Sequence, residues 1–381
     1  MRHTLLIAAG PAEWRAAWLE DGAVAELHVE RGDIRPAGST QFGRVVRRVA
    51  GLDAALVDIG EARPGFLPLR SGAARDLRLD EGAPVVVQVR RETQRGKGAL
   101  LMAAPAQMAA DLEPPMQLDP PPGFAAALAL RLRTAPDEVI VDDPAIIAGL
   151  RAVFAAAEIV QLPTADWPAD LDREFAAALA PSIALPEGGS LHIDEGRAAV
   201  LIDVDTGSPE TGSAERTAMA ANLAAASAIA RQLRLRQIGG GIVVDFAALE
   251  GRRPRERVAA AMTAALAGDP AGPHVLGWTR LGHLELVRPR RLRSLAEAML
   301  DPDTGRPSAL TLAGEALRAL AREARAAPAA DWRIVAAAPV AAALLGPAAA
   351  ALRTLETRLG RGVPVESRAE IAIASFDIVP R

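Results

Sequence analysis

The stretch GSLHIDEGRAAVLIDVDTG occupies residues 189–207. Polar and apolar residues alternate in its first part, and an apolar run then ends in Asp203 and Asp205, a pattern typical of two β-strands. A second apolar run, GIVVD, ends in Asp245 and is separated from the first by a long helical pattern at about 214–236. Strands that alternate with helices predict an α/β sandwich here.

Downstream, the pattern continues with a helix at about 254–267 and the strands HVLGWTR (274–280) and HLELVR (283–288). An Ala-rich helix is expected near 308–326. Residues 332–379 are interpreted as a strand, a helix and two more strands, which form a small α+β end domain.

Upstream, five short strands separated by glycine turns predict a small closed barrel between about Gly43 and Met102. Residues 103–123 are rich in proline and are interpreted as a linker. Short strands are expected within 4–31, around a turn at Glu20-Asp21-Gly22. A strand at 138–143 and a helix at 168–180 complete a mixed α/β layer.

The composition is that of a folded protein of two to three domains, on a length prior of about 150 residues each. The chain has no cysteine, which excludes disulfides and cysteine-bound zinc. No signal peptide is predicted at the N-terminus, so a cytoplasmic location is expected. The longest uncharged stretch, 334–352, contains Pro339 and Pro347 and favours a packed domain over a membrane span.

The net charge of −4 argues against a uniformly basic nucleic-acid binder. Arginines nevertheless cluster at 44–48, 231–236, 252–257 and 288–293. Any one cluster is most simply a solvated face, whereas four together indicate phosphate contacts.

The three aspartates at the strand ends outline a metal site. Asp203 and Asp205 are two residues apart on one strand, so their side chains point to the same face. If the strand that ends at Asp245 is the neighbour, three carboxylates converge. Mg²⁺, or Mn²⁺ in its place, prefers such oxygen ligands. The simpler alternative is that these aspartates cap turns.

Several motifs resemble the catalytic half of the ribonuclease E/G endoribonucleases. The resemblance runs in order from about Leu5 to the C-terminus. The motifs are AALVDIGEARPGFLPL (54–69), ALPEGGSLHID (184–194), LIDVDTGS (201–208), NLAAASAIARQLRLRQIGGGIVVDFAAL (222–249), LGHLELVRPRR (281–291), VAAAPVAAALL (335–345) and ALRTLETRLG (351–360).

The resemblance implies an α+β / α/β multidomain fold, with an S1-type OB-fold RNA-binding barrel inserted in an RNase H-like subdomain. The implied segments are 1–37 (RNase H-like, first part), 38–102 (S1 barrel), 103–123 (Pro-rich linker), 124–188 (RNase H-like, second part), 189–298 (DNase I-like catalytic subdomain), 299–330 (linker and helix) and 331–381 (small C-terminal domain).

It also implies the site residues. Asp203 and Asp245 occupy the positions where the family holds Mg²⁺, and Asp205 stands where the family usually has Asn. Arg280 matches a family arginine near the active site and is expected to stabilise charge on the phosphate. The five histidines form no cluster. His283, beside the LEL strand, is interpreted as incidental, and an approach to the site is the alternative.

In the barrel, Phe66 matches an aromatic residue that stacks on a base, and Leu56 replaces the family's second stacking Phe. An ordinary core aromatic is the alternative reading of Phe66. Lys97, the only lysine among 43 basic residues, matches a phosphate-contacting lysine. Its alternative reading is a solvated loop charge.

Two features of the family are missing from this sequence. The roughly hundred-residue sensor of the RNA 5′ end has no counterpart, because only residues 103–123 are available for it. The family's CxxC zinc link between protomers is replaced by MLDPDTGRPSAL (299–310), so a homodimer would form without zinc.

The leading hypothesis is an endoribonuclease that hydrolyses single-stranded RNA with Mg²⁺ and leaves 5′-phosphate products. The alternative from another class is an RNA-binding or assembly factor of the same fold with weak or no cleavage. A metal-dependent nuclease or phosphatase that acts on other substrates, and does not need the barrel, is the third hypothesis.

Overall fold

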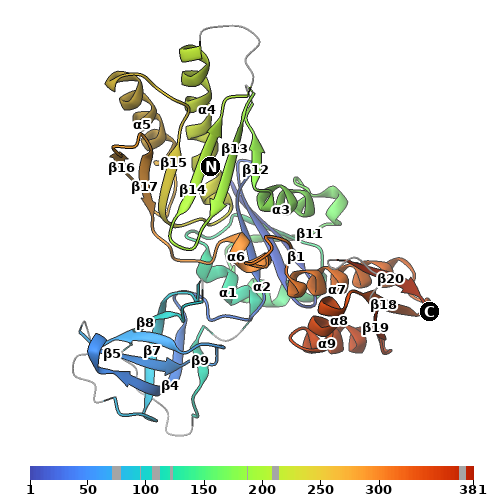
Figure 1. Ribbon diagram of the computed structural model, residues 1–381. Coiled ribbons are helices and arrows are strands. Elements are labelled where there is room, and N and C mark those ends of the chain that lie inside the picture. The colour runs from blue at the N-terminus through green and yellow to red at the C-terminus, as the bar shows by residue number, and fades with distance from the viewer. Residues whose placement is uncertain are drawn as a thin grey trace.

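The structure is a computed structural model that describes residues 1–70, 79–94, 96–104, 112–120, 123–186, 188–207, 214–368 and 375–381. Figure 1 shows a barrel, a large sheet covered by two long helices, and a small C-terminal unit, all arranged around a sheet built from the N-terminus. We call these four parts the barrel, the carboxylate sheet, the C-terminal unit and the N-terminal sheet. The expected mixed α/β multidomain fold with a closed barrel is confirmed.

The N-terminal sheet has the strand order β11-β10-β1-β2-β3. Its strands are β1 (His3–Ala9), β2 (Trp14–Glu20), β3 (Ala23–Glu30), β10 (Glu138–Val141) and β11 (Glu158–Gln161). Strand β1 is apolar at consecutive positions because both faces of the sheet are covered. Leu5 and Ile7 pack against α1 (Phe124–Arg131) and α2 (Ile147–Val153). Leu6 packs on the opposite side with Phe175 of α3 (Leu171–Leu179).

The barrel forms from the expected short strands. They are β4 (Thr40–Val49), β5 (Ala54–Asp58), β6 (Gly65–Pro68), β7 (Pro84–Arg91) and β8 (Leu100–Ala103). Strand β4 pairs with both β5 and β7, which closes the barrel. A further strand, β9 (Met116–Asp119), pairs with β4, so this part of the Pro-rich segment packs on the barrel. Residues 105–111 and 121–122 of that segment lie outside the described residues.

The carboxylate sheet has the strand order β12-β13-β14-β15-β17-β16. Its elements are β12 (Ser182–Ala184), β13 (Ser190–Glu195), β14 (Val200–Asp205), α4 (Ala214–Leu235), β15 (Gly240–Asp245), α5 (Arg252–Leu266), β16 (His274–Trp278) and β17 (Leu284–Arg288). The helices cover one face, and residues such as Ile202, Val244 and Leu286 are buried beneath them. Polar residues alternate with these on the other face, which is open. The strands and both helices expected from the sequence are confirmed.

The C-terminal unit contains α7 (Ala309–Ala326), β18 (Trp332–Ala336), α8 (Ala338–Leu345), α9 (Ala349–Leu359), β19 (Val365–Ser367) and β20 (Phe376–Pro380). The sequence predicted one helix after β18, but two form, with a bend of 74° between them. Pro347 explains the break, because proline lacks the N–H that would continue α8. Among the described residues no single helix is long and apolar enough to cross a membrane, and only the bent α8–α9 pair passes by length and composition.

Buried ion pairs join the N-terminal sheet to the barrel and to the carboxylate sheet. Arg131 of α1 donates to Glu30 of β3 at 2.8 Å and pairs with Glu92, which follows the barrel strand β7, at 2.9 Å. Arg234 of α4 pairs with Glu20 at 2.6 Å and with Glu26 at 2.9 Å. Buried charges require such partners. Each of these two interfaces is therefore favoured in the one relative position of the units that lets its ion pairs form.

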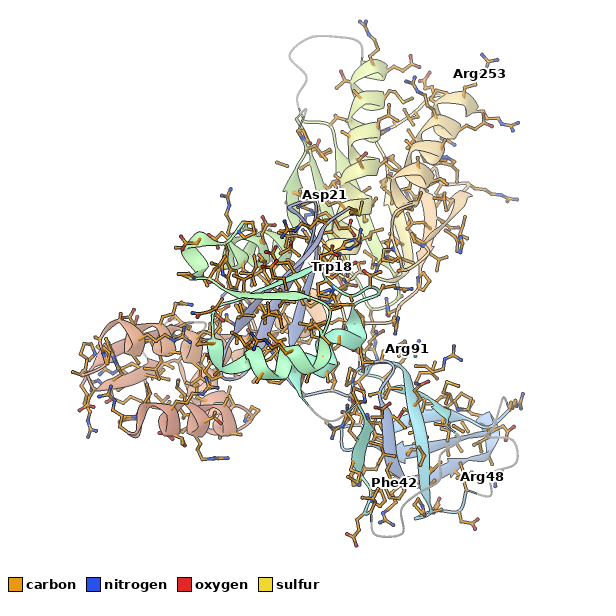
Figure 2. The ribbon with its side chains drawn as sticks, turned by 180° about the vertical axis from the view of Figure 1, so that it is seen from behind. Trp18, Asp21, Phe42, Arg48, Arg91 and Arg253 are labelled. Atoms are coloured by element: carbon orange, nitrogen blue, oxygen red, sulfur yellow. The ribbon has the colours of Figure 1, made fainter. Side chains whose placement is uncertain are left out.

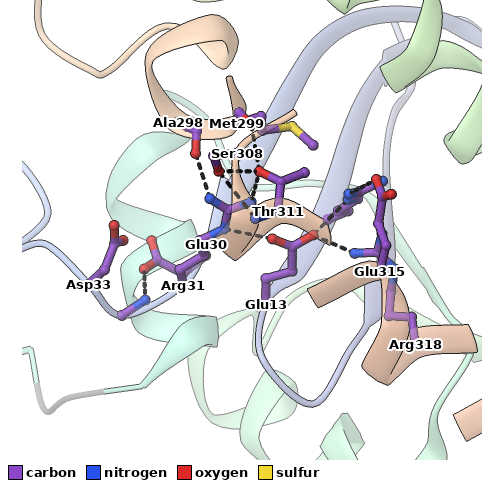
Figure 3. Close-up of polar contacts among 12 residues, drawn as sticks. Glu13, Glu30, Arg31, Asp33, Ala298, Met299, Ser308, Thr311, Glu315 and Arg318 are labelled. Atoms are coloured by element: carbon purple, nitrogen blue, oxygen red, sulfur yellow. Dashed lines mark hydrogen bonds and ion pairs between the residues drawn. The ribbon is translucent and has the colours of Figure 1, made fainter. Parts of the chain in front are cut away.

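A third cluster joins the N-terminal sheet to the C-terminal unit (Figure 3). The carboxylate of Glu13 is 1% exposed and accepts hydrogen bonds from Arg15, from Arg31 and from Arg318 of α7. Burial alone would raise the pKa of Glu13, but the guanidinium groups of Arg31, Arg15 and Arg318 outweigh it and lower the pKa to about 2. Glu13 therefore stays ionised at neutral pH and holds three cations together.

We expect Glu13→Gln to lower the free energy of unfolding by about 3–5 kcal/mol, because it leaves three buried guanidinium groups without their shared counter-charge. The shift is measured as a change in the urea midpoint, followed by tryptophan fluorescence. Glu323→Gln, at an exposed position of the same helix α7, is the matched control and should change little. Equal midpoints for the two variants would show that the cluster does not stabilise the interface.

Candidate active site

Asp203 and Asp245 lie next to each other on adjacent parallel strands. Strands β14 and β15 are neighbours, and their register places Asp203 directly opposite Asp245. The alternation of β14 buries Ile202 and Val204 under the helices, so both aspartates lie on the open face. Neighbouring strands are spaced about 4.8 Å apart, which brings the two carboxylates within the span of one metal ion.

Asp205 is in a different position. It follows Asp203 by two residues and is exposed, but β15 ends at Asp245 and offers no strand residue opposite Asp205. Its Oδ1 instead accepts a hydrogen bond of 2.9 Å from the backbone N–H of Gly207. Within the described ranges, no group of three or more His, Cys, Asp or Glu side chains could hold a metal ion. The structure thus pairs two of the expected carboxylates and gives the third a turn-capping contact.

The aspartate pair lines a cavity of about 400 Å³ at the ends of β14 and β15. The walls come from these strand ends, from α5 and from the turn between β16 and β17. The lining residues are Asp203, Val204, Asp245, Phe246, Ala247, Ala248, Leu249, Arg255, Trp278, Leu281 and Gly282.

Arg255 supplies a positive charge to this cavity. Its guanidinium carbon lies 5.6 Å from the centre of the Trp278 ring, and Trp278 Nε1 donates to the carbonyl oxygen of Arg255 at 3.0 Å. These contacts between α5 and β16 fix the cation near the two carboxylates. In the sequence Arg255 was only one member of the 252–257 cluster. The sequence signal that could have singled out Arg255 was its position in the first turn of the helix that follows the strand ending at Asp245.

Arg280 lies at the tip of the β16–β17 turn. This turn is closed by hydrogen bonds between Thr279 and His283 and between Gly282 and Thr279. Arg280 is exposed and does not line the cavity, although the next two residues do. The structure therefore places the expected arginine next to residues that line the cavity but outside the lining itself.

Two histidines flank the aspartate pair on the open face. His192 of β13 lies opposite Asp203, and His283 Nε2 lies 3.7 Å from Asp245 Oδ1. His192 also shares a hydrogen bond of 3.1 Å with Ser182 Oγ. The sequence favoured His283 as incidental and left its approach to the site as the alternative, because the cross-strand register that creates this contact is not visible in the sequence.

The paired carboxylates suit a hard divalent cation. Mg²⁺ typically binds through one or two protein carboxylates and completes its shell with water and substrate phosphate oxygens. Asp203 and Asp245 are both exposed, and Asp245 retains 61% of its side-chain surface. Their oxygens are therefore accessible to an ion and to a substrate at the same time.

The barrel presents a row of side chains across its outer surface. Phe66 of β6 is half-buried and pairs across the strands with Leu56 on one side and Leu100 on the other. Leu56 in turn pairs with the exposed Arg47 of β4. Phe66 is half-buried and is not part of the buried cluster that fills the barrel. The Phe66 side chain is therefore partly accessible to solvent.

Lys97 is exposed in the loop between β7 and β8, where it forms a bridge with Gln94. It lines a small hollow together with Arg91 of the barrel and with Arg197 and Arg290 of the carboxylate sheet. The structure thus brings the lysine together with arginines from another unit.

The arginine clusters divide into two kinds. Those at 44–48 and 252–257 are largely exposed, as expected for solvated faces or phosphate contacts. Those at 231–236 and 288–293 each contain one buried arginine: Arg236 is 4% exposed, and Arg288 forms a buried pair with Asp269 at 2.6 Å. The other arginines of these two clusters are half-buried or exposed. Arg234 of the first cluster also pairs across an interface with Glu20 and Glu26, a role that neither reading of the sequence had considered.

Comparison with known proteins identifies the segment that contains the cavity. Residues 130–291 match the model of the Ribonuclease E/G family, which confirms the resemblance seen in the sequence. Ribonuclease E of Nostoc sp. (strain PCC 7120) is 42% identical over 125 residues, 32% of this chain and 18% of that protein. Ribonuclease E of Escherichia coli K12 is 26% identical over 400 aligned positions, 78% of this chain and 38% of that protein.

Ribonuclease G of Escherichia coli K12 is 34% identical over 131 residues, which cover 34% of this chain and 27% of that protein. In each of these three comparisons the matched region covers less than half of the relative's length. This chain therefore matches only part of the length of each of these relatives.

Asp203→Asn should stabilise the fold when no metal is present. Like charges directly opposite each other on neighbouring strands destabilise a sheet by about 0.2–1 kcal/mol, so removing one charge should raise the thermal midpoint by roughly 1–3 °C. Thermal melts in EDTA measure this. Asp194→Asn is the matched control, since Asp194 is exposed on the same face but lies opposite Leu201. A midpoint that falls, or rises equally in both variants, would contradict the predicted repulsion.

Proposed function

On the premise that residues 130–291 form a ribonuclease E/G segment, we propose that this protein is a Mg²⁺-dependent endoribonuclease. It hydrolyses single-stranded RNA and leaves a 5′-phosphate on the downstream product. The observation that carries this proposal is the in-register pair Asp203 and Asp245 in a cavity that also holds Arg255.

The proposal assigns a role to each unit of the fold. The N-terminal sheet, with antiparallel β1-β2-β3 extended by parallel β10 and β11, corresponds to an RNase H-like subdomain. The carboxylate sheet, with α4 and α5 on one face, corresponds to a DNase I-like catalytic subdomain. The barrel corresponds to an S1-type RNA-binding module that brings the strand to the catalytic face.

In this mechanism Asp203 and Asp245 hold the divalent ion. When bound, Mg²⁺ or Mn²⁺ supplies polarisation of the scissile phosphate and activation of water. Water adds to phosphorus and the bond to the 3′ oxygen breaks, which gives a 3′-hydroxyl and a 5′-phosphate.

The basic and aromatic side chains of the cavity complete the site. Arg255 lies where it can neutralise charge on the phosphate oxygens, and Trp278 holds Arg255 in place. Arg280, at the tip of the adjacent turn, is the second cation that the phosphate would meet on entering.

The barrel residues bind the substrate. The exposed side of Phe66 stacks on a base, and Lys97 contacts a phosphate. Leu56 has no π-face and contributes only apolar contact. Since residues 103–123 leave no room for a 5′-end sensor, cleavage should not depend on the 5′ group of the RNA.

The second candidate is an RNA-binding or assembly factor with weak or no cleavage. It is favoured by the turn-capping contact of Asp205 and by the position of Arg280 outside the cavity lining. Under either candidate the protein acts in the cytoplasm on single-stranded RNA. A homodimer would have no cysteine-bound zinc, because the chain contains no cysteine.

The test is internal cleavage of a labelled AU-rich single-stranded RNA that carries either a 5′-monophosphate or a 5′-triphosphate. Cleavage should require Mg²⁺ and should fall at least about 100-fold in Asp203→Ala and Asp245→Ala, because each removes a ligand that stabilises charge in the transition state. Rates should be similar for the two 5′ groups.

Asp194→Ala, which removes an exposed carboxylate from the same face, is the control and should cleave like the wild type. Tight RNA binding without cleavage in any metal would favour the second candidate. Cleavage that persists after removal of residues 38–102 would favour a nuclease that does not need the barrel.

Leu56→Phe should strengthen RNA binding by roughly 5-fold or more, because a stacked base contributes about 1–3 kcal/mol. The affinity is measured by fluorescence anisotropy in EDTA, where no cleavage occurs. Leu52→Phe, which adds the same ring at a position of the barrel that is 63% exposed and lies outside the Phe66 row, is the control. Equal affinities for the two variants would argue against a stacking surface at Phe66.

A further inference from the structure

Most residues that line the cavity at the aspartate pair are apolar. Of its eleven lining residues, three are charged, namely Asp203, Asp245 and Arg255, and the other eight are apolar or glycine. The charged side chains suit a divalent ion and one phosphate, but they leave the rest of a cavity of about 400 Å³ without a partner. Ligand sites typically combine a few polar groups with apolar and aromatic walls, which bind the apolar part of the ligand.

Two large apolar side chains of this lining are accessible to solvent. Leu281, in the β16–β17 turn, is 85% exposed, and Trp278, at the end of β16, is half-buried. We call these two residues the apolar wall. A single exposed leucine is ordinary, as Leu276 shows, which is 65% exposed on the same hairpin but outside the cavity lining. Leu281 differs from Leu276 because it lines one cavity together with an aromatic ring and two carboxylates.

The turn that carries Leu281 has a defined shape. The N–H of Thr279 donates to the carbonyl oxygen of His283 at 2.8 Å, and the N–H of His283 donates to Thr279 Oγ1 at 3.1 Å. The N–H of Gly282 donates to the carbonyl oxygen of Thr279 at 3.1 Å, with a φ of 95° that favours glycine. The backbone of the turn therefore holds Leu281 at the cavity without burying its side chain.

Trp278 is held from two sides. Its Nε1 donates to the carbonyl oxygen of Arg255 at 3.0 Å, which ties the ring to α5. Its ring also lies 5.9 Å from the ring of Phe246, at an angle of 51°, and Phe246 is 6% exposed. These contacts fix the orientation of the indole beside the carboxylates.

A buried asparagine fixes the part of the cavity that follows Asp245. Asn222 of α4 is fully buried, and its Nδ2 donates to the carbonyl oxygen of Ala247 at 2.8 Å. The N–H of Ala247 donates back to Asn222 Oδ1 at 3.0 Å. The cavity is thus formed by segments that are already ordered, so a ligand that binds there loses less conformational entropy on the protein side.

We propose that the apolar wall binds the base of a nucleotide next to the scissile phosphate. The base is the planar, apolar part of RNA, and every base has a face that can stack on an aromatic side chain. The phosphate then lies at the aspartate pair and Arg255, while the base contacts Trp278 and Leu281. This inference rests on the proposed function in one respect, that a phosphate of the substrate binds at the aspartate pair.

This base subsite is separate from the barrel. Figure 2 labels Arg253, which lies two residues before Arg255 in the first turn of α5, and Arg48 of the barrel, at opposite ends of the molecule. The base at the cavity and the base at Phe66 therefore belong to different nucleotides. Because stacking uses the face of a base and not its edge, the subsite should accept all four bases.

The test uses two ligands that contain no bond between nucleotides, so that Mg²⁺ can be present without cleavage. Binding of adenosine 5′-monophosphate and of ribose 5-phosphate is measured by ligand-observed NMR titration. The wild type should bind the nucleotide more tightly by about 5-fold or more, because only the nucleotide has a base that stacks. Equal affinities for the two ligands would overturn the proposal.

Leu281→Ser should reduce the ratio of the two affinities by about threefold or more, because it removes apolar surface that the base would cover. Leu281→Phe should keep or raise the ratio. Leu276→Ser makes the same change at an exposed position of the same hairpin and is the matched control, with the ratio of the wild type. Both leucines are exposed, so neither change should unfold the protein. Equal ratios in Leu281→Ser and Leu276→Ser would overturn the proposal.

Phe66→Ala separates the cavity from the barrel. It should keep most of the preference for the nucleotide, because that preference arises at Trp278 and Leu281. A preference that disappears in Phe66→Ala and persists in Leu281→Ser would assign base binding to the barrel alone and overturn the proposal. A protein that shows the expected ratios but cleaves no RNA would refute the nuclease proposal and leave the base subsite standing.

Discussion

Buried arginine–carboxylate pairs are the constraint on which the arrangement of the four units depends. A guanidinium group that is buried away from water requires a counter-charge, and its planar set of N–H donors binds a carboxylate in few orientations. Such pairs fix the relative orientation of the units that they join, whereas apolar contacts alone allow two units to slide against each other. The pairs are Arg131 with Glu30 and Glu92 at the barrel, Arg234 with Glu20 and Glu26 at the carboxylate sheet, and Arg318 with Glu13 at the C-terminal unit.

This rigidity matters for the function that we propose. The barrel surface and the carboxylate cavity belong to different segments of the chain, and a single RNA strand can contact both only if their relative positions are fixed. Glu92 contributes to this directly, since it pairs with Arg131 and accepts from the backbone of Arg293. The same carboxylate thus joins the barrel, the N-terminal sheet and the carboxylate sheet.

Much of the fold was predictable because local pattern and tertiary environment agree. The β14 strand shows strict alternation, and the structure buries one side of it and exposes the other. The barrel strands and α4, α5 and α7 were likewise visible. The Ala-rich 338–359 segment was less predictable, because alanine fits one helix as well as two and the position of Pro347 decided between them.

The sequence by itself determined most of the strands and the long helices, that Asp203 and Asp245 end apolar strands, and that any metal must be bound without cysteine. The tertiary structure alone decided which residues these aspartates contact. It placed the two aspartates in register, gave Asp205 a turn to cap, set Arg255 in the cavity and Arg280 outside it, and buried Arg236 and Arg288. The physical reason is that periodicity reports which face of an element is buried, whereas strand order, register and the partner of a buried charge depend on residues far away in the chain.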